Sequence, residues 1–274
     1  MRTASGLATR SKSTFELLQA FLRAAMIEGP SVVDRVKVRA EGRRSEPKAS
    51  GRLATSTDWP AELHHLLHVS WPCTTCEGFA EQVWPSISSR TGAAPLGRDA
   101  HDGDAGLAHA AWSVARHLEP AVVVETGVAR GMTSAAILAA LRSNGSGRLF
   151  SIDLPPLTKG WAEQSGVAVE PRLRSRWTYL RGSTRRRLPP LLAAVGGIDI
   201  FVHDSLHTFE TMTFEFRCAW EALRPGGVMI SDDIDDNMAF EVFVADQAPA
   251  ASTIIGEESS KAGRRFGLLR KGFP

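Results

Sequence analysis

The segment from Val122 to Thr133 constrains the fold of the 274-residue chain more than any other part of its sequence. Three valines followed by Glu125 predict a buried strand, Gly127 and Gly131 predict a tight turn, and a helical pattern begins at Thr133. A glycine turn between a strand and a helix lets a ligand approach the backbone and the free N–H groups at the start of the helix. The segment therefore predicts a ligand site in an α/β fold.

A second predicted strand, 148–152, is followed by Asp153, where an acid can hold the two hydroxyl groups of a ribose. The spacing Gly127-x-x-x-Gly131 differs from the three-glycine turn that binds a pyrophosphate, which disfavours NAD and FAD. Glu125 precedes the first glycine by two residues, where a carboxylate can attract an ammonium or sulfonium group. These residues predict a nucleoside cofactor that has no phosphates and carries a positive charge. A plain tight turn without a ligand is the alternative.

Strands and helices alternate regularly from residue 120. The predicted strands are 121–125, 148–152, 177–180, 198–203, 228–231, 252–255 and 265–270. The predicted helices between them are 132–143, 184–194, 208–223 and 237–246. This alternation predicts a doubly wound, mostly parallel, seven-stranded α/β sheet that is covered on both faces. The last two strands have no helix between them and predict an antiparallel edge.

Three regions are expected: a basic, flexible extension and linker at 1–58, a helical cap at 59–118 and a catalytic domain at 119–274. Residues 1–56 hold 11 Lys and Arg but only 5 Asp and Glu, as in a loosely ordered extension or a transit peptide. One short amphipathic helix at Phe15–Ile27 is also expected. The predicted cap helices are 61–69, 76–84 and 104–118.

The composition predicts a cytoplasmic protein that does not span a membrane. No apolar run approaches the roughly 20 residues of a membrane-spanning helix. Three cysteines are an odd number and do not indicate a disulfide scaffold in a chain of this size. A cytoplasmic location is therefore the expectation.

Acidic residues follow two predicted strands at the edge where open α/β sheets place their sites. Asp204 and His207 follow the strand 198–203, and Asp232 and Asp233 follow the strand 228–231. Three carboxylates at neighbouring strand ends favour Mg²⁺, which binds a few carboxylates and keeps positions for substrate oxygens. Helix capping and solvated loop charges are the alternative. For His207 the alternatives are a general base and a residue that binds backbone at a helix start.

These motifs resemble those of class I S-adenosylmethionine-dependent methyltransferases over residues 120–270. Within that class they resemble the metal-dependent O-methyltransferases related to macrocin-type sugar O-methyltransferases and to cephalosporin-hydroxylase-like proteins. The matching segments are Glu125–Gly131, Ile152-Asp153, Arg181-Gly182-Ser183 and Leu223–Ile230. The chain departs from the usual pattern at Ala129, which stands between the two glycines, and at Asp232, where many members have glutamate.

The resemblance implies S-adenosylmethionine as the cofactor and Mg²⁺ as the metal. It implies a cofactor site made of Glu125, Gly127, Ala129, Gly131, Thr133, Asp153, Gly182, Ser183 and Asp204. It also implies Mg²⁺ ligands at Asp204, Asp232 and Asp233, and catalytic roles for His207 as the base and for Asp204. The expected substrate is a hydroxyl group of a small molecule, such as a sugar or natural product, and a homo-oligomer is expected.

Two other functions stay open, an RNA methyltransferase and a non-catalytic cofactor-binding protein. A run of arginines interleaved with Trp177 and Tyr179 fits nucleic-acid binding, although a solvated edge of the sheet is the favoured explanation. The run consists of Arg172, Arg174, Arg176, Arg181, Arg185, Arg186 and Arg187. A nucleic-acid partner is therefore not expected.

Two further segments carry weaker signals. His64, His68, Cys73 and Cys76 are four potential zinc ligands, although free or buried thiols are the favoured explanation. The insertion 154–171, which contains Trp161, has the length of a lid over an active site, and a plain crossover is the alternative.

Overall fold

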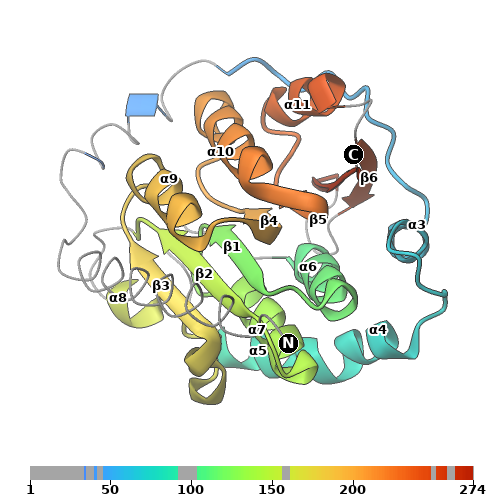
Figure 1. Ribbon diagram of the computed structural model, residues 1–274, viewed down its shortest axis with the longest axis vertical. Coiled ribbons are helices and arrows are strands. Elements are labelled where there is room, and N and C mark those ends of the chain that lie inside the picture. Colours follow the sequence, from blue (N-terminus) through green and yellow to red (C-terminus); the bar gives the residue numbers. More distant parts are fainter. Residues whose placement is uncertain are drawn as a thin grey trace, which may run out of the picture.

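The structure is a computed structural model. It describes residue 34 and residues 40–41, 46–91, 104–155, 161–247, 251–257 and 263–273. The predicted helix at Phe15–Ile27 and the transit-peptide hypothesis lie outside these residues. The described chain forms a central sheet with helices on both sides (Figure 1).

Seven strands form one sheet in the order β3-β2-β1-β4-β5-β7-β6. Their bounds are β1 (Val122–Thr126), β2 (Arg148–Asp153), β3 (Trp177–Arg181), β4 (Ile198–His203), β5 (Leu223–Ser231), β6 (Ala251–Glu257) and β7 (Arg265–Lys271). Strands β1 to β5 pair in parallel, and β7 pairs antiparallel with both β5 and β6. The predicted seven-stranded, mostly parallel sheet with an antiparallel edge is confirmed.

Helices of several lengths surround the sheet. Those before β1 are α3 (Trp59–Leu66), α4 (Thr74–Gly78), the π-helical η1 (Phe79–Val83), α5 (Trp84–Thr91) and α6 (Ala105–Leu118). Those after β1 are α7 (Met132–Asn144), α8 (Trp161–Gln164), the 3₁₀-helical η2 (Pro171–Arg176), α9 (Thr184–Val195), α10 (Phe209–Ala222) and α11 (Ala239–Gln247). Among the described helices, none combines the length and apolar character that a membrane span requires.

Two elements differ markedly from their predicted bounds. The helix expected at 76–84 is divided into α4, the π-helical turn η1 and the start of α5. Strand β5 begins at Leu223, before its predicted start at 228, because Leu223 pairs with Ile198 ahead of the glycine-rich turn. A shift in register between Ile198 and Ile200 accommodates this turn, so pairing continues beyond the segment that looks like a loop in the sequence.

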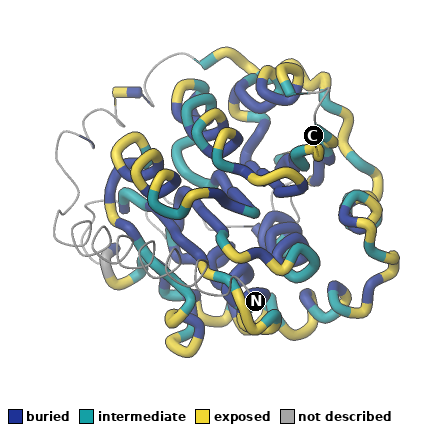
Figure 2. Tube along the Cα trace, viewed as in Figure 1, coloured by how far each residue is buried: buried dark blue, intermediate teal, exposed yellow. Residues whose placement is uncertain are grey.

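Alternating strand residues supply the cores on the two faces of the sheet, and the interior of the chain is buried (Figure 2). Val123 packs on one face in the same cluster as Leu107 of α6, and Val124 packs on the other face with Phe216 of α10. The first cluster also contains Leu63 and Phe79, which come from α3 and η1. The helices of the predicted cap therefore share one hydrophobic core with the sheet.

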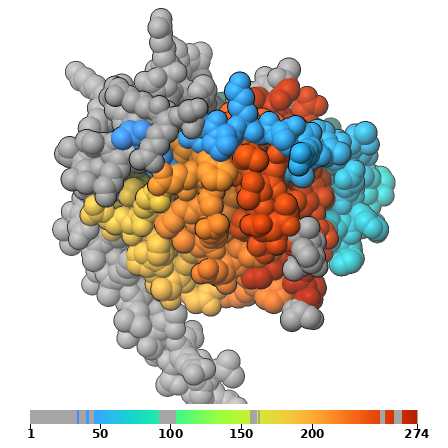
Figure 3. All heavy atoms as spheres, turned by 90° about the horizontal axis from the view of Figure 1, so that it is seen from above, coloured from blue at the N-terminus to red at the C-terminus, as the bar shows by residue number. Residues whose placement is uncertain are grey.

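Residues 46–56, predicted as part of a linker, lie across α10 and α11 (Figure 3). The carboxylate of Glu46 accepts a hydrogen bond from the backbone N–H of Phe209 at 2.7 Å. The carbonyl of Pro47 accepts from Met238 at 2.9 Å, and Glu241 accepts from the backbone N–H of Gly51 at 2.8 Å. These contacts attach the segment to the starts of both helices.

Candidate active site

The structure brings the predicted site residues to one edge of the sheet. Because β1 to β5 are parallel, their carboxyl ends lie at the same edge, where open α/β sheets bind ligands. The residues at or just beyond these ends are Glu125, Gly127, Ala129, Gly131, Thr133, Asp153, Gly182, Ser183, Asp204, His207, Asp232 and Asp233.

The turn after β1 contacts the segment after β4. Gly127 has a φ of +84°, and a Cβ atom at this position would lie 1.7 Å from the backbone oxygen of Asp204. The N–H of Gly127 donates to the carbonyl of Ile152 at 2.8 Å, and the N–H of Asp204 donates to the carbonyl of Thr126 at 2.8 Å. Only glycine fits here, so the predicted cofactor turn lies directly beside the first predicted metal ligand.

The start of α7 is left open toward a ligand. Gly131 lies at its N-cap position, and no side chain caps the helix. The hydroxyl of Thr133 is buried and has no hydrogen-bond partner among the described residues. Ala129 has a φ of +45°, and its carbonyl accepts from Gly166 at 3.0 Å, so the insertion after β2 supports the turn. The arrangement leaves donors at the helix start available to a ligand.

Glu125 is buried behind the turn with one oxygen unpaired. Its Oε2 atom accepts hydrogen bonds from Ser134 and Ser151, both at 2.6 Å. Its Oε1 atom has no partner within the described part of the chain. Trp177 donates from Nε1 to the hydroxyl of Ser151 at 2.9 Å, which orients that serine. Burial raises the pKa of Glu125 to about 7, because the hydrogen bonds from Ser134 and Ser151 offset only part of the cost of desolvation.

Asp153 lies where the ribose site was predicted. Its Oδ2 atom accepts from the hydroxyl of Tyr179 at 3.1 Å, and the backbones of Val128 and Leu154 also bind its carboxylate. Burial outweighs these hydrogen bonds and raises its pKa to about 6. The backbone oxygen of Asp153 accepts from Gly182 at 2.8 Å, so the loop after β3 is tied to the same strand end.

The loop after β3 leads directly into α9. Ser183 lies at the N-cap position of α9 and is 8% exposed, and its side chain makes no capping hydrogen bond. A Cβ atom at Gly182 would lie 2.8 Å from Nε of Arg187, so this turn is packed against the arginine. The loop implied as part of the cofactor site therefore combines a glycine turn with an uncapped helix start.

Asp204, His207 and Asp232 form a cluster at the ends of β4 and β5. Their potential ligand atoms lie within 4.8 Å of one another. Oδ1 of Asp232 and Nε2 of His207 are buried and lack hydrogen-bond partners in the described chain. Burial and the nearby carboxylate of Asp232 raise the pKa of Asp204 well above its usual value. Two close carboxyl groups without a cation are a donor set that fits a divalent metal ion.

Asp233 belongs to a second group, with His207 and Asp236. Its Oδ1 atom accepts from Nε of Arg264 at 2.9 Å, and Oδ2 lies 3.4 Å from Nδ1 of His207. The structure thus joins two of the three predicted metal ligands, Asp204 and Asp232, and pairs the third with an arginine. The partner, Arg264, was missed from the sequence, since the contact links two loops, one after β5 and one just before β7.

His207 is supported by a buried network that the sequence did not reveal. Burial, together with the nearby His203, lowers the pKa of His207, so its neutral form is favoured. The rings of His203 and His207 lie 5.2 Å apart between centroids. Glu215 of α10 binds Nδ1 of His203 at 2.7 Å and accepts from Thr126 at 2.5 Å. The sequence signal that could have identified Glu215 is an acidic residue on the apolar face of the predicted helix 208–223.

One family model matches the part of the chain that contains the candidate site. Residues 124–234 match a family model described as a methyltransferase domain, and this range runs from β1 to just beyond Asp233. These residues match a methyltransferase domain. The match includes the glycine turn, Asp153 and the acidic cluster, which were the segments that carried the prediction.

Two solved structures share the fold of this chain. An O-methyltransferase from Klebsiella pneumoniae is 16% identical, with a TM-score of 0.51 over 79% of this chain and 98% of that chain. Cofactor-bound Rv0187 from MTB is 17% identical, with a TM-score of 0.50 over 80% of this chain and 99% of that chain. No curated protein matches the sequence of the methyltransferase.

The arginine run of the methyltransferase is largely engaged within the protein. Arg174 donates to the carbonyls of Val169 and Gly166, and Arg176 donates to those of Gly147 and Gly145. Carboxylates or a backbone oxygen bind four others: Arg172, Arg185, Arg186 and Arg187. These contacts give most of the run a role within the fold, and RNA binding stays an alternative prediction.

Trp161 of the methyltransferase is buried in the insertion after β2. Its Nε1 atom has no hydrogen-bond partner in the described structure, and residues 156–160 of the insertion lie outside that structure. A role for this segment as a lid stays a prediction.

Proposed function

We propose that the protein transfers the methyl group of S-adenosylmethionine to a hydroxyl of a small molecule, such as a sugar or natural product, with the help of Mg²⁺. The contact between Gly127 and Asp204 carries this proposal. It places the cofactor turn directly beside a pair of carboxylates and a neutral histidine, which are the groups that a hydroxyl acceptor needs.

The cofactor part of the proposal is supported by two buried acids beside the glycine turn. Glu125 and Asp153 flank the glycine turn, and burial raises the pKa of both carboxyls. S-adenosylmethionine carries a sulfonium and an ammonium, so its positive charge complements these acids, and its ribose can be bound by Asp153. A pyrophosphate cofactor would add negative charge and has no third glycine to accommodate it.

The metal part is supported by the unpaired Oδ1 atom of Asp232 beside Asp204. These two carboxylates would hold the ion, and a bound Mg²⁺ lowers the pKa of a coordinated hydroxyl. The two side chains would also fix the position of the acceptor relative to the glycine turn, and such alignment of two substrates lowers the barrier by up to about 7–11 kcal/mol.

His207 is the proposed general base. Its Nδ1 atom faces Asp233, which leaves the unpaired Nε2 atom to accept the hydroxyl proton. The substrate oxygen then forms a bond to the methyl carbon as the carbon–sulfur bond breaks, which leaves S-adenosylhomocysteine. Asp233 and Arg264 act as positioning residues, since their ion pair holds the carboxylate against the imidazole.

Calorimetry with S-adenosylmethionine, with Mg²⁺ present and after chelation, tests the cofactor and the metal separately. We expect binding in both conditions, whereas turnover on hydroxyl acceptors should be lost after chelation and restored by Mg²⁺. Asp204→Asn and Asp232→Asn should abolish this response, and Asp233→Asn should retain it because Asp233 pairs with Arg264.

Three outcomes would contradict the proposal. Folded protein that fails to bind S-adenosylmethionine would remove the cofactor assignment and favour a scaffold role. Full turnover in the presence of chelator would remove the metal. Methylation of RNA together with retention of RNA at physiological salt, but no transfer to small acceptors, would replace the substrate class.

A further inference from the structure

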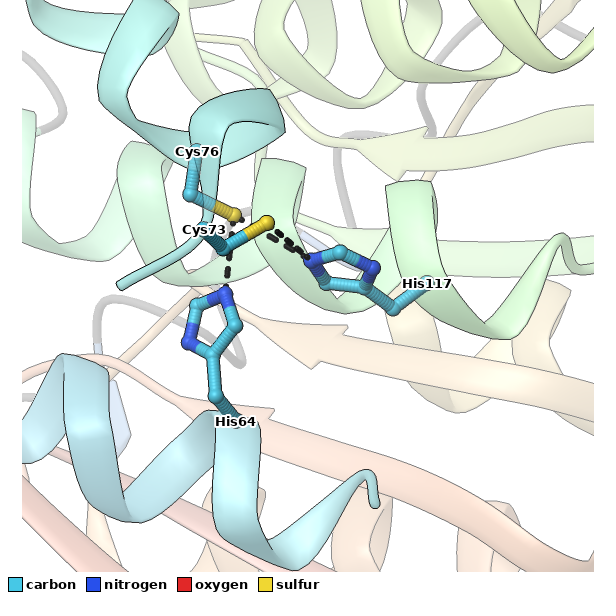
Figure 4. Close-up of side chains that lie close together, drawn as sticks. All are labelled: His64, Cys73, Cys76 and His117. Atoms are coloured by element: carbon cyan, nitrogen blue, oxygen red, sulfur yellow. Dashed lines mark hydrogen bonds between the residues drawn. The ribbon is translucent and has the colours of Figure 1, made fainter. Parts of the chain in front are cut away.

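A separate group of potential metal ligands lies away from the acidic cluster. His64 of α3, Cys73 and Cys76 at the start of α4, and His117 near the end of α6 point toward one another (Figure 4). All four ligand atoms lie within 4.8 Å of one another. Three of these residues are buried and His117 is partly buried, so they converge beneath the surface. The structure replaces the predicted fourth ligand, His68, which is exposed, with His117.

Three distances between the ligand atoms lie close to those of a tetrahedral zinc site. With zinc–sulfur bonds of about 2.3 Å and zinc–nitrogen bonds of about 2.0–2.1 Å, neighbouring ligand atoms lie about 3.3–3.8 Å apart. Nε2 of His117 lies 3.6 Å from Sγ of Cys73 and 3.3 Å from Sγ of Cys76. Nε2 of His64 lies 3.1 Å from Sγ of Cys76. Small adjustments of the side chains would complete the tetrahedron.

Neighbouring groups orient two of the ligands. Nδ1 of His64 donates to the carbonyl of Pro60 at 2.6 Å, which leaves Nε2 as the unprotonated atom that faces the cysteines. The hydroxyl of Ser113 lies 3.3 Å from Sγ of Cys76 and can donate to a thiolate. Such outer hydrogen bonds fix the tautomer and direction of metal ligands. Two thiolates also balance the charge of Zn²⁺, so the whole group can be buried as a neutral unit.

We propose that His64, Cys73, Cys76 and His117 bind one zinc ion that joins α3 and α4 to the end of α6. The set closes all four tetrahedral positions with protein atoms, which is the arrangement of a structural rather than a catalytic zinc site. It follows that this ion stabilises the fold and leaves no position for a substrate.

The position of the group in the fold agrees with this role. His117 lies near the end of α6, just before β1 begins at Val122, whereas the glycine turn follows the other end of β1. The five residues of β1, at about 3.3 Å per residue, separate the two edges. The zinc site therefore holds the N-terminal helices in place without contacting the acidic cluster.

Metal content and cobalt substitution of the full chain, purified without chelator, test the proposal. We expect one tightly bound zinc per chain. Replacement of that zinc by Co²⁺ should give thiolate-to-cobalt charge-transfer bands and strong ligand-field bands of a tetrahedral ion, which the carboxylate site cannot produce. Chelation strong enough to remove the zinc should lower the Tm.

Matched variants distinguish the four proposed zinc ligands from cysteine and histidine residues outside the group. Cys76→Ser should lose one zinc per chain, whereas Cys218→Ser and His68→Ala should keep it, because Cys218 lies in α10 and His68 lies outside the group. His117→Cys should keep the metal with a cobalt spectrum of three thiolates, which holds even if the serine variant fails to fold.

Wild-type protein with no bound zinc and no thiolate bands after cobalt addition would overturn the proposal. So would a Cys73–Cys76 disulfide in the native protein, or a cobalt spectrum that His117→Cys leaves unchanged.

Discussion

The Nδ1 atom of His203 lies 2.7 Å from Oε2 of Glu215, and neither side chain is exposed to solvent. Burial opposes ionisation of Glu215, but His203 and the hydroxyl of Thr126 outweigh it and lower the pKa of the carboxyl. The same carboxylate accepts from Ser205 at 2.9 Å. One side chain of α10 thus binds the ends of β1 and β4 and the loop that carries Asp204.

Replacing Glu215 with alanine should destabilise the protein strongly. Loss of the carboxylate leaves His203 and the hydroxyl of Thr126 buried without this partner, so we expect a loss of about 3–5 kcal/mol in the free energy of unfolding. Urea denaturation measures this loss. Glu221→Ala, at an exposed position of the same helix, should change stability by less than about 0.5 kcal/mol. Equal effects in the two variants would show that the network does not support the fold.

His207→Gln should reduce kcat by about 10²–10⁴-fold and leave the affinity for S-adenosylmethionine unchanged, because His207 acts as a base. Burial and His203 lower the pKa of His207 from its ordinary value of about 6.5. The wild-type rate should therefore fall only at pH values below about 6.5, where His207 becomes protonated. Single-turnover assays across pH and calorimetry measure both effects, with His65→Ala at an exposed position as the control. A change confined to KM would contradict the role of His207.

Glu125 should make the stability of the ligand-free protein depend on pH. Its pKa is raised from 4.5 to about 7, so the folded state holds a proton that the unfolded state releases. Its contribution is fully present below about pH 4.5 and is lost as the pH rises through about 7. Asp153 acts in the same direction at lower pH, since its pKa is raised to about 6.

Glu125→Gln should flatten this pH dependence between pH 5 and 8, because the amide cannot titrate. Urea denaturation of both proteins at several pH values provides the comparison. Parallel stability curves for the wild type and the variant would rule out Glu125 as the source.

Gly127→Ala should disrupt the site far more than Gly145→Ala. Both glycines have positive φ, at +84° and +75°, so each alanine has to adopt a left-handed backbone that costs about 1–2 kcal/mol. A Cβ atom at Gly127 would also collide with the backbone of Asp204, whereas nothing lies within 4 Å of one at Gly145.

Thermal unfolding and calorimetry with S-adenosylmethionine report the two effects. Gly127→Ala should lose cofactor binding, and Gly145→Ala should show only the modest loss of stability. Tight cofactor binding by Gly127→Ala would mean that the turn and the loop after β4 can separate.

The sequence predicts the sheet well because its signals are local. Apolar runs followed by glycine or an acid identify β1 and β2, and the methyltransferase assignment based on them is confirmed by the match over residues 124–234. The start of β5 at Leu223 could not be predicted, because its pairing continues past a glycine-rich turn that resembles a loop end. Pairing between strands decides that boundary.

The acids of the site show the same limit. Sequence alone indicates that Asp204, Asp232 and Asp233 follow neighbouring strands, but it does not indicate which of them meet. Arg264 comes from the approach to β7 and binds Asp233 through a contact between residues far apart in the chain. Such contacts depend on tertiary packing, which a pattern of single residues does not encode.

The place of β7 between β5 and β6 has a consequence for the order in which the fold can form. β6 is made before β7 but lies outside it, so β6 has no partner in the sheet until residues 265–271 have been synthesised. During translation, at about 5–20 residues per second, the edge of β5 stays unpaired until β7 has been synthesised. In a chain interrupted before Arg265, the edge of β5 would stay exposed and β6 would have no strand to pair with.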